Sequence, residues 1–399
     1  MSNIHSTSHL DRIYVTRHLI HTLSKWEITD TIIPSDHKMV LTRISPPNLP
    51  YIGEGRWTMP LALLHDDKPI YEITAAGVEL QRDLESATPH DQNPQLRWVT
   101  FKQQIMTTMK KSAKKQNAKM MNKIKALKKD MENIEQQEDL DMNDVLCTHL
   151  TFLCQEHQHL DQKLNRNERA KAQAHWFDKG EKINKYWTWI HSPRKPRDII
   201  HTLYDPTADK ITMKSSDMAE IAWKYHDDLQ SKNLLNYHDP ERQAAQAEVL
   251  QQIPEFQKFN TPESDITNLI TKDQVTVALH SSKNGTATGL DGLPYELWKL
   301  LHDQHNQLAK QNKPSFNIIK CLTLIYNHIQ TLGTLEETNF LISWMCPLYK
   351  KKDQTKIENY HPIMLLNTDY KIMTKALATQ LATHACSLLH QDQSGFVPT

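Results

Sequence analysis

Apolar and polar residues alternate in short runs near the N-terminus, whereas the middle of the chain repeats apolar residues at helical spacing. Alternation across residues 10–45 is typical of β-strands, because successive side chains of a strand face opposite ways. We expect segments 11–16 and 38–44 to pair, which would bring Asp11 toward His37. Two strands alone cover few apolar side chains. We therefore expect residues 10–45 to be poorly ordered or to pack against another part of the chain.

The segment from Gln95 to Lys179 contains neither glycine nor proline, the residues that most often interrupt helices. Within it, a set of mainly apolar residues recurs three or four positions apart: Leu146, Leu150, Leu153, His157 and Leu160. This spacing predicts long helices or a helical hairpin. The prolines before it, and the cluster Gly53-Glu54-Gly55-Arg56-Trp57, indicate a connector over residues 49–94.

Composition narrows the class of protein. The 399 residues carry no net formal charge and include only 9 glycines, which favours a helix-rich chain with few tight turns. The 5 cysteines are odd in number and scattered, as expected for reduced thiols inside a cell. The sequence shows neither a signal peptide nor an apolar run near the ~18 residues of a membrane span. We therefore expect an intracellular protein, in the cytoplasm or nucleus, without a membrane partner.

A neutral net charge hides two opposite blocks. Residues 101–129 contain ten lysines and no acid, and seven acids follow between Asp130 and Asp144. One interpretation is that a helix presents the lysines to phosphates of RNA or DNA, without sequence preference. The other is that the basic and acidic halves pair in a hairpin. The lysines proposed for nucleic-acid binding are Lys110, Lys111, Lys114 and Lys115.

Cysteine and histidine residues between Cys147 and His159 could suggest a zinc site. Zinc ligands usually come in pairs two to four residues apart, whereas Cys147 and Cys154 are seven apart, two helical turns. We expect both cysteines to lie in the core, beside the row of leucines that begins at Leu146, and we expect no metal site.

A carboxylate that orients an imidazole is a common hydrolytic device, and Asp11 with His37 could form one. Asp36, next to His37, adds charge suited to a metal ion. Segments 8–15 and 35–40, Ser-His-Leu-Asp-Arg-Ile-Tyr-Val and Ser-Asp-His-Lys-Met-Val, resemble the last two strands of the endonuclease/exonuclease/phosphatase superfamily. The resemblance implies that His37 acts at the scissile phosphate, that Asp11 orients it and that Asp36 lies near the metal.

The C-terminal third carries a second ordered set of motifs. A loop, Lys283-Asn284-Gly285-Thr286-Ala287-Thr288-Gly289-Leu290-Asp291-Gly292-Leu293-Pro294, precedes a predicted helix, with Pro294 suited to its first turn. An apolar segment ending in lysines, then Asn359-Tyr360-His361-Pro362-Ile363, and finally Gln393-Ser394-Gly395-Phe396-Val397-Pro398 follow in order. The set resembles the fingers of reverse transcriptases of LINE-type (non-LTR) retrotransposons, and residues 176–187 resemble a further segment of those polyproteins.

In that family, arginine occupies the position of His361. The resemblance implies that its planar fork would hold the triphosphate of a nucleotide, with Lys350 or Lys351 adding charge. Histidine is mostly neutral at pH 7 and offers at most two donors. We expect weakened nucleotide binding, which favours a decayed copy over a diverged consensus.

These motifs predict a predominantly α chain with small α+β parts. We expect a two-strand remnant of an endonuclease β-sandwich, a long helical linker and truncated reverse transcriptase fingers. The expected segments are an endonuclease remnant (1–48), a connector (49–94), a helical linker (95–200), a helical connector (201–262) and the fingers (263–399). The family places its catalytic aspartates, including a Y-x-D-D turn that holds Mg²⁺, beyond the last motif matched here.

The sequence therefore predicts a fragment of a retrotransposon polyprotein that combines endonuclease and RNA-directed DNA polymerase. Because both metal sites of the family are missing, we expect the chain by itself to be inactive and to bind neither Mg²⁺ nor a small-molecule cofactor. Two alternatives remain open: a helical, non-catalytic remnant that binds nucleic acid, and a repurposed structural or interaction protein.

Overall fold

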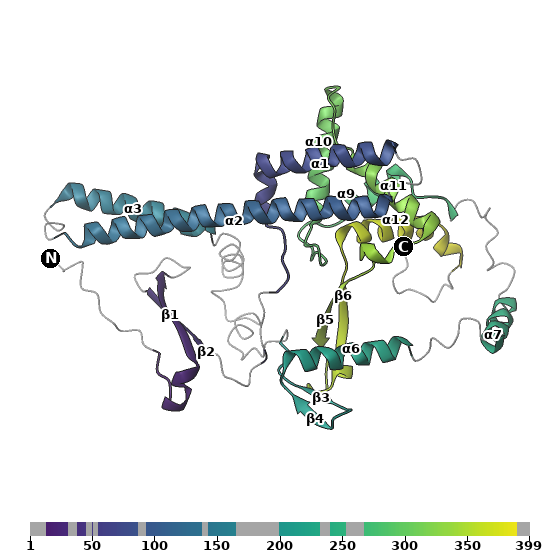
Figure 1. Ribbon diagram of the computed structural model, residues 1–399, viewed down its shortest axis with the longest axis horizontal. Helices are drawn as coiled ribbons and strands as arrows, with labels where there is room; N and C mark the ends of the chain where they lie inside the picture. The colour runs from purple at the N-terminus through teal and green to yellow at the C-terminus, as the bar shows by residue number, and fades with distance from the viewer. Residues whose placement is uncertain are drawn as a thin grey trace. The chain divides into compact units, whose positions relative to one another are not determined.

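The computed structural model describes residues 13–30, 38–44, 50, 55–86, 93–137, 143–164, 199–231, 240–252 and 267–388 (Figure 1). The chain divides into two compact units, each assembled from separate stretches. The first unit comprises 1–52, 116–225 and 349–359, and the second comprises 53–115, 226–348 and 360–399.

Helices dominate the described residues. They are α1 (Asp67–Ser86), α2 (Pro94–Glu135), α3 (Asp144–Leu164), α6 (Ser215–Ser231), α7 (Pro240–Gln251), α9 (Lys272–His280), α10 (Tyr295–Lys310), α11 (Ile318–Leu332) and α12 (Thr368–Leu388). Short 3-10 helices span Arg17–Thr22, Leu61–His65, Glu336–Thr338 and Ile357–Asn359. In these stretches, no helix combines the length and apolarity that crossing a membrane requires.

The strands form three two-stranded sheets in the described stretches. Their pairs are β1 (Leu23–Asp30) with β2 (Lys38–Ile44), β3 (Leu203–Asp205) with β4 (Lys210–Thr212), and β5 (Trp344–Tyr349) with β6 (Tyr360–Leu365). The mainly helical composition with small sheets agrees with the coarse fold expected from the sequence.

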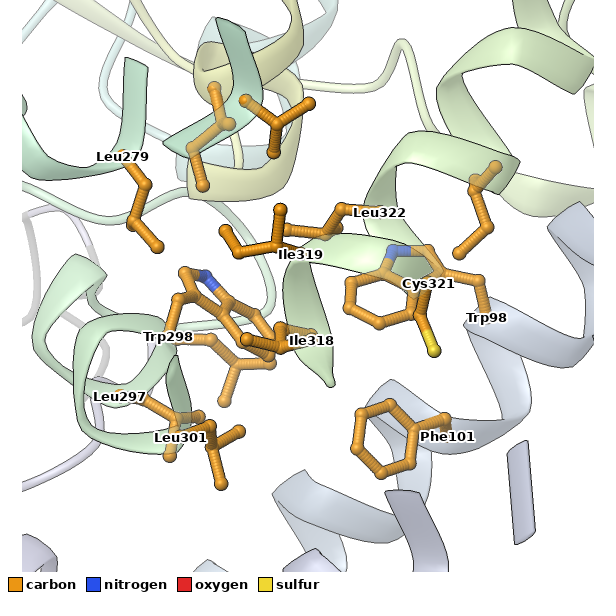
Figure 2. Close-up of a cluster of buried hydrophobic side chains, with 14 of the residues drawn as sticks. Trp98, Phe101, Leu279, Leu297, Trp298, Leu301, Ile318, Ile319, Cys321 and Leu322 are labelled. Atoms are coloured by element: carbon orange, nitrogen blue, oxygen red, sulfur yellow. The ribbon is translucent and has the colours of Figure 1, made fainter. Parts of the chain in front are cut away.

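The second unit has a core built from helices α1, α2, α9, α10, α11 and α12. The start of α2 contributes one face, with a residue every three or four positions: Trp98, Phe101, Ile105 and Met109. The Trp98 ring lies 5.6 Å from that of Phe101 and 5.5 Å from that of Trp298 in α10 (Figure 2). Cys321 of α11 is fully buried in this core. The aromatic side chains thus join the beginning of α2 to the C-terminal helices.

Residues 49–94, expected to be a connector, include α1 and part of this core. Ile70 and Ile73 of α1 are buried there, and Gly77 lies so close to the Phe316 ring that a Cβ would collide with it. Two prolines of this segment stand at the starts of helices: Pro60 caps a 3-10 helix, and Pro94 begins α2. Proline is well tolerated in a first turn, so these residues mark helix starts instead of a structureless link.

In the first unit, the later half of α2 packs with α3, as the sequence predicts. Leu127 and Ile134 of α2 and Leu153 of α3 are buried together, and partly buried apolar residues surround them: Met131, Leu146, Leu150 and Leu160. The expectation of core cysteines is wrong, because Cys147 and Cys154 are exposed. Each directly follows a leucine of the row that begins at Leu146, and one residue turns a helix by about 100°, away from the packed face.

The N-terminal strand pairing also differs from the prediction. Strand β2 covers the expected 38–44, but its antiparallel partner is β1 at 23–30, with Ile28 opposite Val40. Residues 13–16 belong to no helix or strand. A connection of seven residues separates β1 from β2, whereas pairing with 11–16 would require closing a much longer loop. The shorter connection therefore favours the pairing of β1 with β2.

Candidate functional site

The loop of residues 283–294 packs directly on the beginning of α12 in the second unit. Gly289 touches Asn367 so closely that a Cβ at this position would collide with the Asn367 amide oxygen and backbone nitrogen. The Asn367 side-chain oxygen accepts a hydrogen bond from the Asp291 backbone N–H at 3.2 Å. Thr368 donates its hydroxyl to the Leu293 carbonyl at 2.8 Å. Two segments that are distant in the sequence thus pack against each other.

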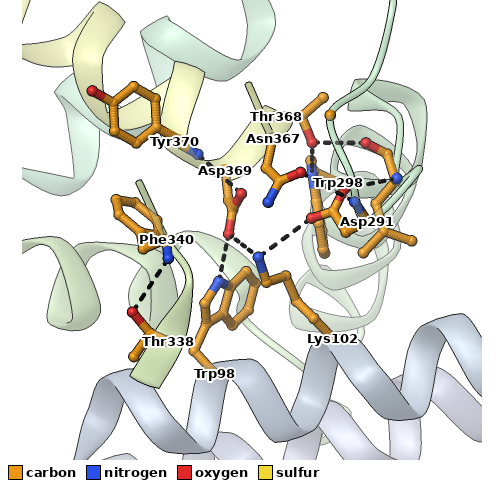
Figure 3. Close-up of polar contacts among 12 residues, drawn as sticks. Trp98, Lys102, Asp291, Trp298, Thr338, Phe340, Asn367, Thr368, Asp369 and Tyr370 are labelled. Carbon is orange, nitrogen blue, oxygen red and sulfur yellow. Dashed lines mark hydrogen bonds and ion pairs between the residues drawn. The ribbon is translucent and has the colours of Figure 1, made fainter. Parts of the chain in front are cut away.

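A buried ionic cluster lies at this junction (Figure 3). The Lys102 ammonium of α2 is 2.8 Å from an Asp369 carboxylate oxygen and 3.3 Å from one of Asp291. The same Asp369 oxygen accepts a hydrogen bond from the Trp98 indole at 2.7 Å. The side chains of Lys102, Asp291 and Asp369 are 8%, 6% and 0% exposed, so water contributes little to their solvation.

Burial and charge act against each other in this cluster. Burial alone would lower the pKa of Lys102, but the charges and hydrogen bonds of Asp369 and Asp291 outweigh burial and raise it. Burial raises the pKa of Asp291, the Asp369 charge raises it further, and Lys102 opposes both. Lys102 therefore remains an ammonium that neutralises part of the charge of two carboxylates.

Sequence reasoning missed Lys102, which it counted as one more residue of the basic block. The sequence does contain a sign that Lys102 differs from the other lysines. It is eight residues from the next lysine and follows Trp98 by one helical turn. It therefore lies on the apolar face that Trp98 and Ile105 define. Because its three charged side chains are buried, this cluster is suited to fixing the loop against α12. It is not suited to binding a ligand from solvent.

Two further cations hold the same loop from other elements. Arg56 donates from Nη1 to the Thr288 hydroxyl and to the Gly289 carbonyl, both at 2.7 Å. Lys371 of α12 donates from Nζ to the Ala287 carbonyl at 2.9 Å. Burial lowers the pKa of Lys371, and the positive charge of Arg56 lowers it further.

The residues proposed for nucleotide binding are exposed and lie beside neighbouring strands. Lys350 and Lys351 directly follow β5, and His361 is the second residue of β6. The Lys350 backbone N–H donates to the Asn359 carbonyl at 3.0 Å, next to the hydrogen-bonded pair of strands.

The lysines proposed for nucleic-acid binding, Lys110, Lys111, Lys114 and Lys115, are all exposed on α2. The Lys110 ammonium lies 5.2 Å from the centre of the Trp57 ring. Farther along α2, Lys123 forms an ion pair at 2.6 Å with Glu156. That acid belongs to α3 and lies outside the acidic run at 130–144.

The proposed endonuclease residues Asp11, Asp36 and His37 lie outside the described residues. The tetrapeptide Tyr225-His226-Asp227-Asp228 has the letters of the polymerase Y-x-D-D turn, but it lies within helix α6, with both aspartates exposed. In the described stretches, no group of three or more His, Cys, Asp or Glu side chains is arranged to hold a metal ion.

A buried ionic cluster and two further cations thus hold the loop on α12. The chain is 29% identical over 134 residues to the "Transposon TX1 uncharacterized 149 kDa protein" of Xenopus laevis. The match spans 32% of this chain but only 9% of that protein. No protein-family profile matches the chain. The similarity relates the chain to a transposon protein, in line with the origin expected from its motifs.

Proposed function

We propose that the chain is part of a retrotransposon polyprotein and that residues 263–399 form the fingers of its reverse transcriptase. The observation that carries this proposal is the packing of Gly289 and Asp291 against Asn367 and Thr368. Gly289 and Asp291 belong to the loop motif of the resembled family, and Asn367 and Thr368 lie a few residues after its Asn359–Ile363 motif, about 75 residues farther along the chain. Chance matches to short motifs have no reason to meet with atomic fit. The similarity to a transposon protein supports the same origin.

In this proposal, Lys350, Lys351 and His361 face the triphosphate of an incoming nucleotide, and Mg²⁺ would accompany that nucleotide. Their exposure leaves them accessible to such a ligand. A guanidinium at position 361 would donate two hydrogen bonds to phosphate, whereas a neutral imidazole donates only one. The chain is therefore proposed to hold nucleotides weakly. Asp11, Asp36 and His37 are proposed as the remnant of a phosphodiester-cleaving site.

The test is nucleotide binding with the full chain and its His361→Arg variant. Titration with a deoxynucleoside triphosphate and Mg²⁺ should give an affinity for the variant about tenfold or more above that of the unchanged chain, because a charge-assisted hydrogen bond contributes ~1.5–3 kcal/mol. Changing Lys350 and Lys351 together to Gln should remove this gain. The matched control is Lys310→Gln with Lys313→Gln, two exposed lysines elsewhere in the second unit. Equal affinity of the unchanged chain and His361→Arg would contradict the proposal.

We also propose that these 399 residues alone neither extend a primer nor nick a supercoiled plasmid with Mg²⁺ or Mn²⁺. The Y-x-D-D letters at 225–228 lie in a helix, so they cannot form the strand-turn-strand that presents two carboxylates to metal ions. Nucleotide incorporation above a heat-killed control, or nicking abolished by His37→Ala, would contradict this.

A second candidate function is non-catalytic binding of nucleic acid by the exposed lysines of α2. Lys111, Lys114 and Lys115 make no ion pair with the described residues, which favours this candidate over a purely structural helix at that part of α2. Around Lys123 the ion pair with Glu156 favours the structural role instead.

A further inference from the structure

The loop of residues 286–289 is held by two cations whose partners among the described residues are neutral oxygens. Arg56 binds the Thr288 hydroxyl and the Gly289 carbonyl, and Lys371 binds the Ala287 carbonyl. These acceptors satisfy part of the hydrogen-bonding capacity of an arginine with five donors and a lysine with three. Both side chains are half-buried and keep donors for a further partner.

No acid neutralises this pair of cations in the described part of the chain. Neither Arg56 nor Lys371 forms an ion pair with a carboxylate there. The nearby Asp291 is buried and already engaged by Lys102. The two cations are close enough that Arg56 lowers the pKa of Lys371, in addition to the effect of burial. The Asp291 charge offsets only part of this effect on Lys371, so an added anion between the two cations would stabilise them further.

The basic surface continues from this loop onto α2. Trp57 follows Arg56 in the sequence, and its ring and carbonyl lie against Gly292 of the same loop. Lys110 lies over the Trp57 ring. From there the exposed lysines Lys111, Lys114 and Lys115 follow along α2, in a stretch of sequence without a single acid from 101 to 129. All these residues belong to the second unit.

We infer that Arg56 and Lys371 form a phosphate-binding site that takes the backbone of single-stranded nucleic acid. Phosphate oxygens accept charge-assisted hydrogen bonds from guanidinium and ammonium groups. The lysines of α2 continue the positive surface, which suits a polyanion better than an isolated phosphate. Trp57 supplies an aromatic surface of the kind on which unpaired bases stack. This site uses none of Lys350, Lys351 or His361 and stands whether or not those residues bind nucleotide.

The competing account is that both cations only brace the loop. Their bonds to carbonyl oxygens would then be their whole role, and replacing them would change stability but not the affinity for phosphate. Charge-preserving variants separate the two accounts. Arg56→Lys and Lys371→Arg keep the positive charge that a phosphate needs while changing the geometry of the bonds to the loop.

The experiment measures binding of a fluorescent oligothymidylate and an oligouridylate to the full chain by anisotropy, from about 50 mM salt upward. Arg56→Gln with Lys371→Gln should weaken binding roughly tenfold or more at the lowest salt. The slope of log affinity against log salt should become about 1.4 less negative, at ~0.7 for each of two single-strand phosphates. The charge-matched control, Lys310→Gln with Lys313→Gln, should leave affinity and slope nearly unchanged. The charge-preserving pair should retain most of the affinity.

Competition identifies the source of the phosphate. An unlabelled oligonucleotide should displace the probe, whereas inorganic pyrophosphate or a nucleoside triphosphate should do so only at far higher concentration. Equal loss of affinity in the Gln pair and its control would overturn the site. Binding of the triphosphate that depends on Arg56 and Lys371, without oligonucleotide binding, would overturn the assignment to single strands. Thermal melting of every variant excludes unfolding as the cause of lost binding.

Discussion

At the scale of single residues, Lys102 links two carboxylates inside the second unit. Its ammonium pairs with the two buried carboxylates of Asp291 and Asp369, and the Trp98 indole donates a hydrogen bond to Asp369. Replacing it by an apolar residue would leave two acids buried without their counter-charge. Breaking one side of a buried ion pair commonly costs about 3–5 kcal/mol.

We therefore expect Lys102→Met to lower the free energy of unfolding by about 3–5 kcal/mol, measured by urea denaturation at neutral pH. Methionine keeps most of the aliphatic length, so lost packing contributes little. The control is Lys111→Met, at an exposed position of the same helix, with an expected change within about 0.5 kcal/mol. Similar effects of the two substitutions would show that the cluster is not electrostatically important.

Asp291 gives a prediction about pH. Its pKa in the folded chain is raised above the ordinary value of 3.8, first by burial and then by Asp369. Between 3.8 and the raised pKa, the folded chain binds this proton more tightly than the unfolded chain. The contribution of Asp291 to stability is therefore present at low pH and is lost as the pH rises through this window.

In Asp291→Asn, this contribution should disappear. The difference in free energy of unfolding between the unchanged chain and the variant should vary with pH across the window and become constant above it. Urea denaturation at a series of pH values measures this difference, and other titrating groups cancel when the two curves are subtracted. A difference that is the same at every pH would contradict the raised pKa of Asp291.

The charged residues also show what sequence reasoning reaches at this scale. Exposure of Lys110, Lys111, Lys114 and Lys115 was predictable because surface is the usual place for lysine. The burial of Lys102 depends on Asp291 and Asp369, which are far away in the sequence, and only the folded chain brings the three together.

At the scale of elements, the helical hairpin of α2 and α3 was predictable because its apolar spacing is local. The strand partner of β2 and the role of residues 49–94 were not predictable from the sequence. Both depend on which segments of the chain pair or pack with each other. The prolines of 49–94 indicate a connector, yet Pro60 caps a 3-10 helix and Pro94 begins α2. The same residue can end one element or start the next, and the sequence does not distinguish these roles.

The contact between the loop and α12 should be intolerant of added volume. In Gly289→Ala, the new Cβ would collide with Asn367, so the loop or the start of α12 must shift. We expect a loss of about 1–3 kcal/mol in the free energy of unfolding, as for other overpacked sites. In the control Gly285→Ala, a Cβ meets open space, and only the cost of a positive φ of 70° remains.

Thermal and urea unfolding of both variants check this prediction. Gly289→Ala with Asn367→Ala should recover part of the loss, because the smaller side chain relieves part of the collision, whereas Gly285→Ala with Asn367→Ala should show no such recovery. If Asn367→Ala recovers none of the loss in Gly289→Ala, the packing of the loop on α12 is looser than the structure describes.

At the scale of the whole molecule, the two units do not follow the order of the sequence. Helix α2 belongs to the second unit up to Lys115 and to the first from Gln116. A reading of the sequence divides a chain into consecutive segments, so the expected boundary at residue 95 separated α1 from α2, which share one core. Contacts between distant segments determine where one unit ends and the next begins, and no local sequence pattern indicates these contacts.

The lysines of α2 give a prediction for the chain as a whole. If Lys110, Lys111, Lys114 and Lys115 contact duplex DNA, replacing all four by Gln should make the slope of log affinity against log salt less negative by about 3–4, at ~0.9 per phosphate. The melting temperature should hardly change, because all four are exposed. Filter binding at several salt concentrations measures the slope. Absence of duplex binding near 50 mM salt, where such contacts are strongest, would contradict it.

The burial of Cys321 gives the second unit a built-in reporter of its own opening. Burial raises the pKa of this thiol to about 12, so almost no thiolate is present at neutral pH. Cys147 and Cys154 are exposed and should react with a disulfide reagent at once. Modification of Cys321 must wait until α11 leaves the core. Its rate of labelling, followed residue by residue by mass spectrometry, would therefore measure how often this core opens while the chain remains folded on average.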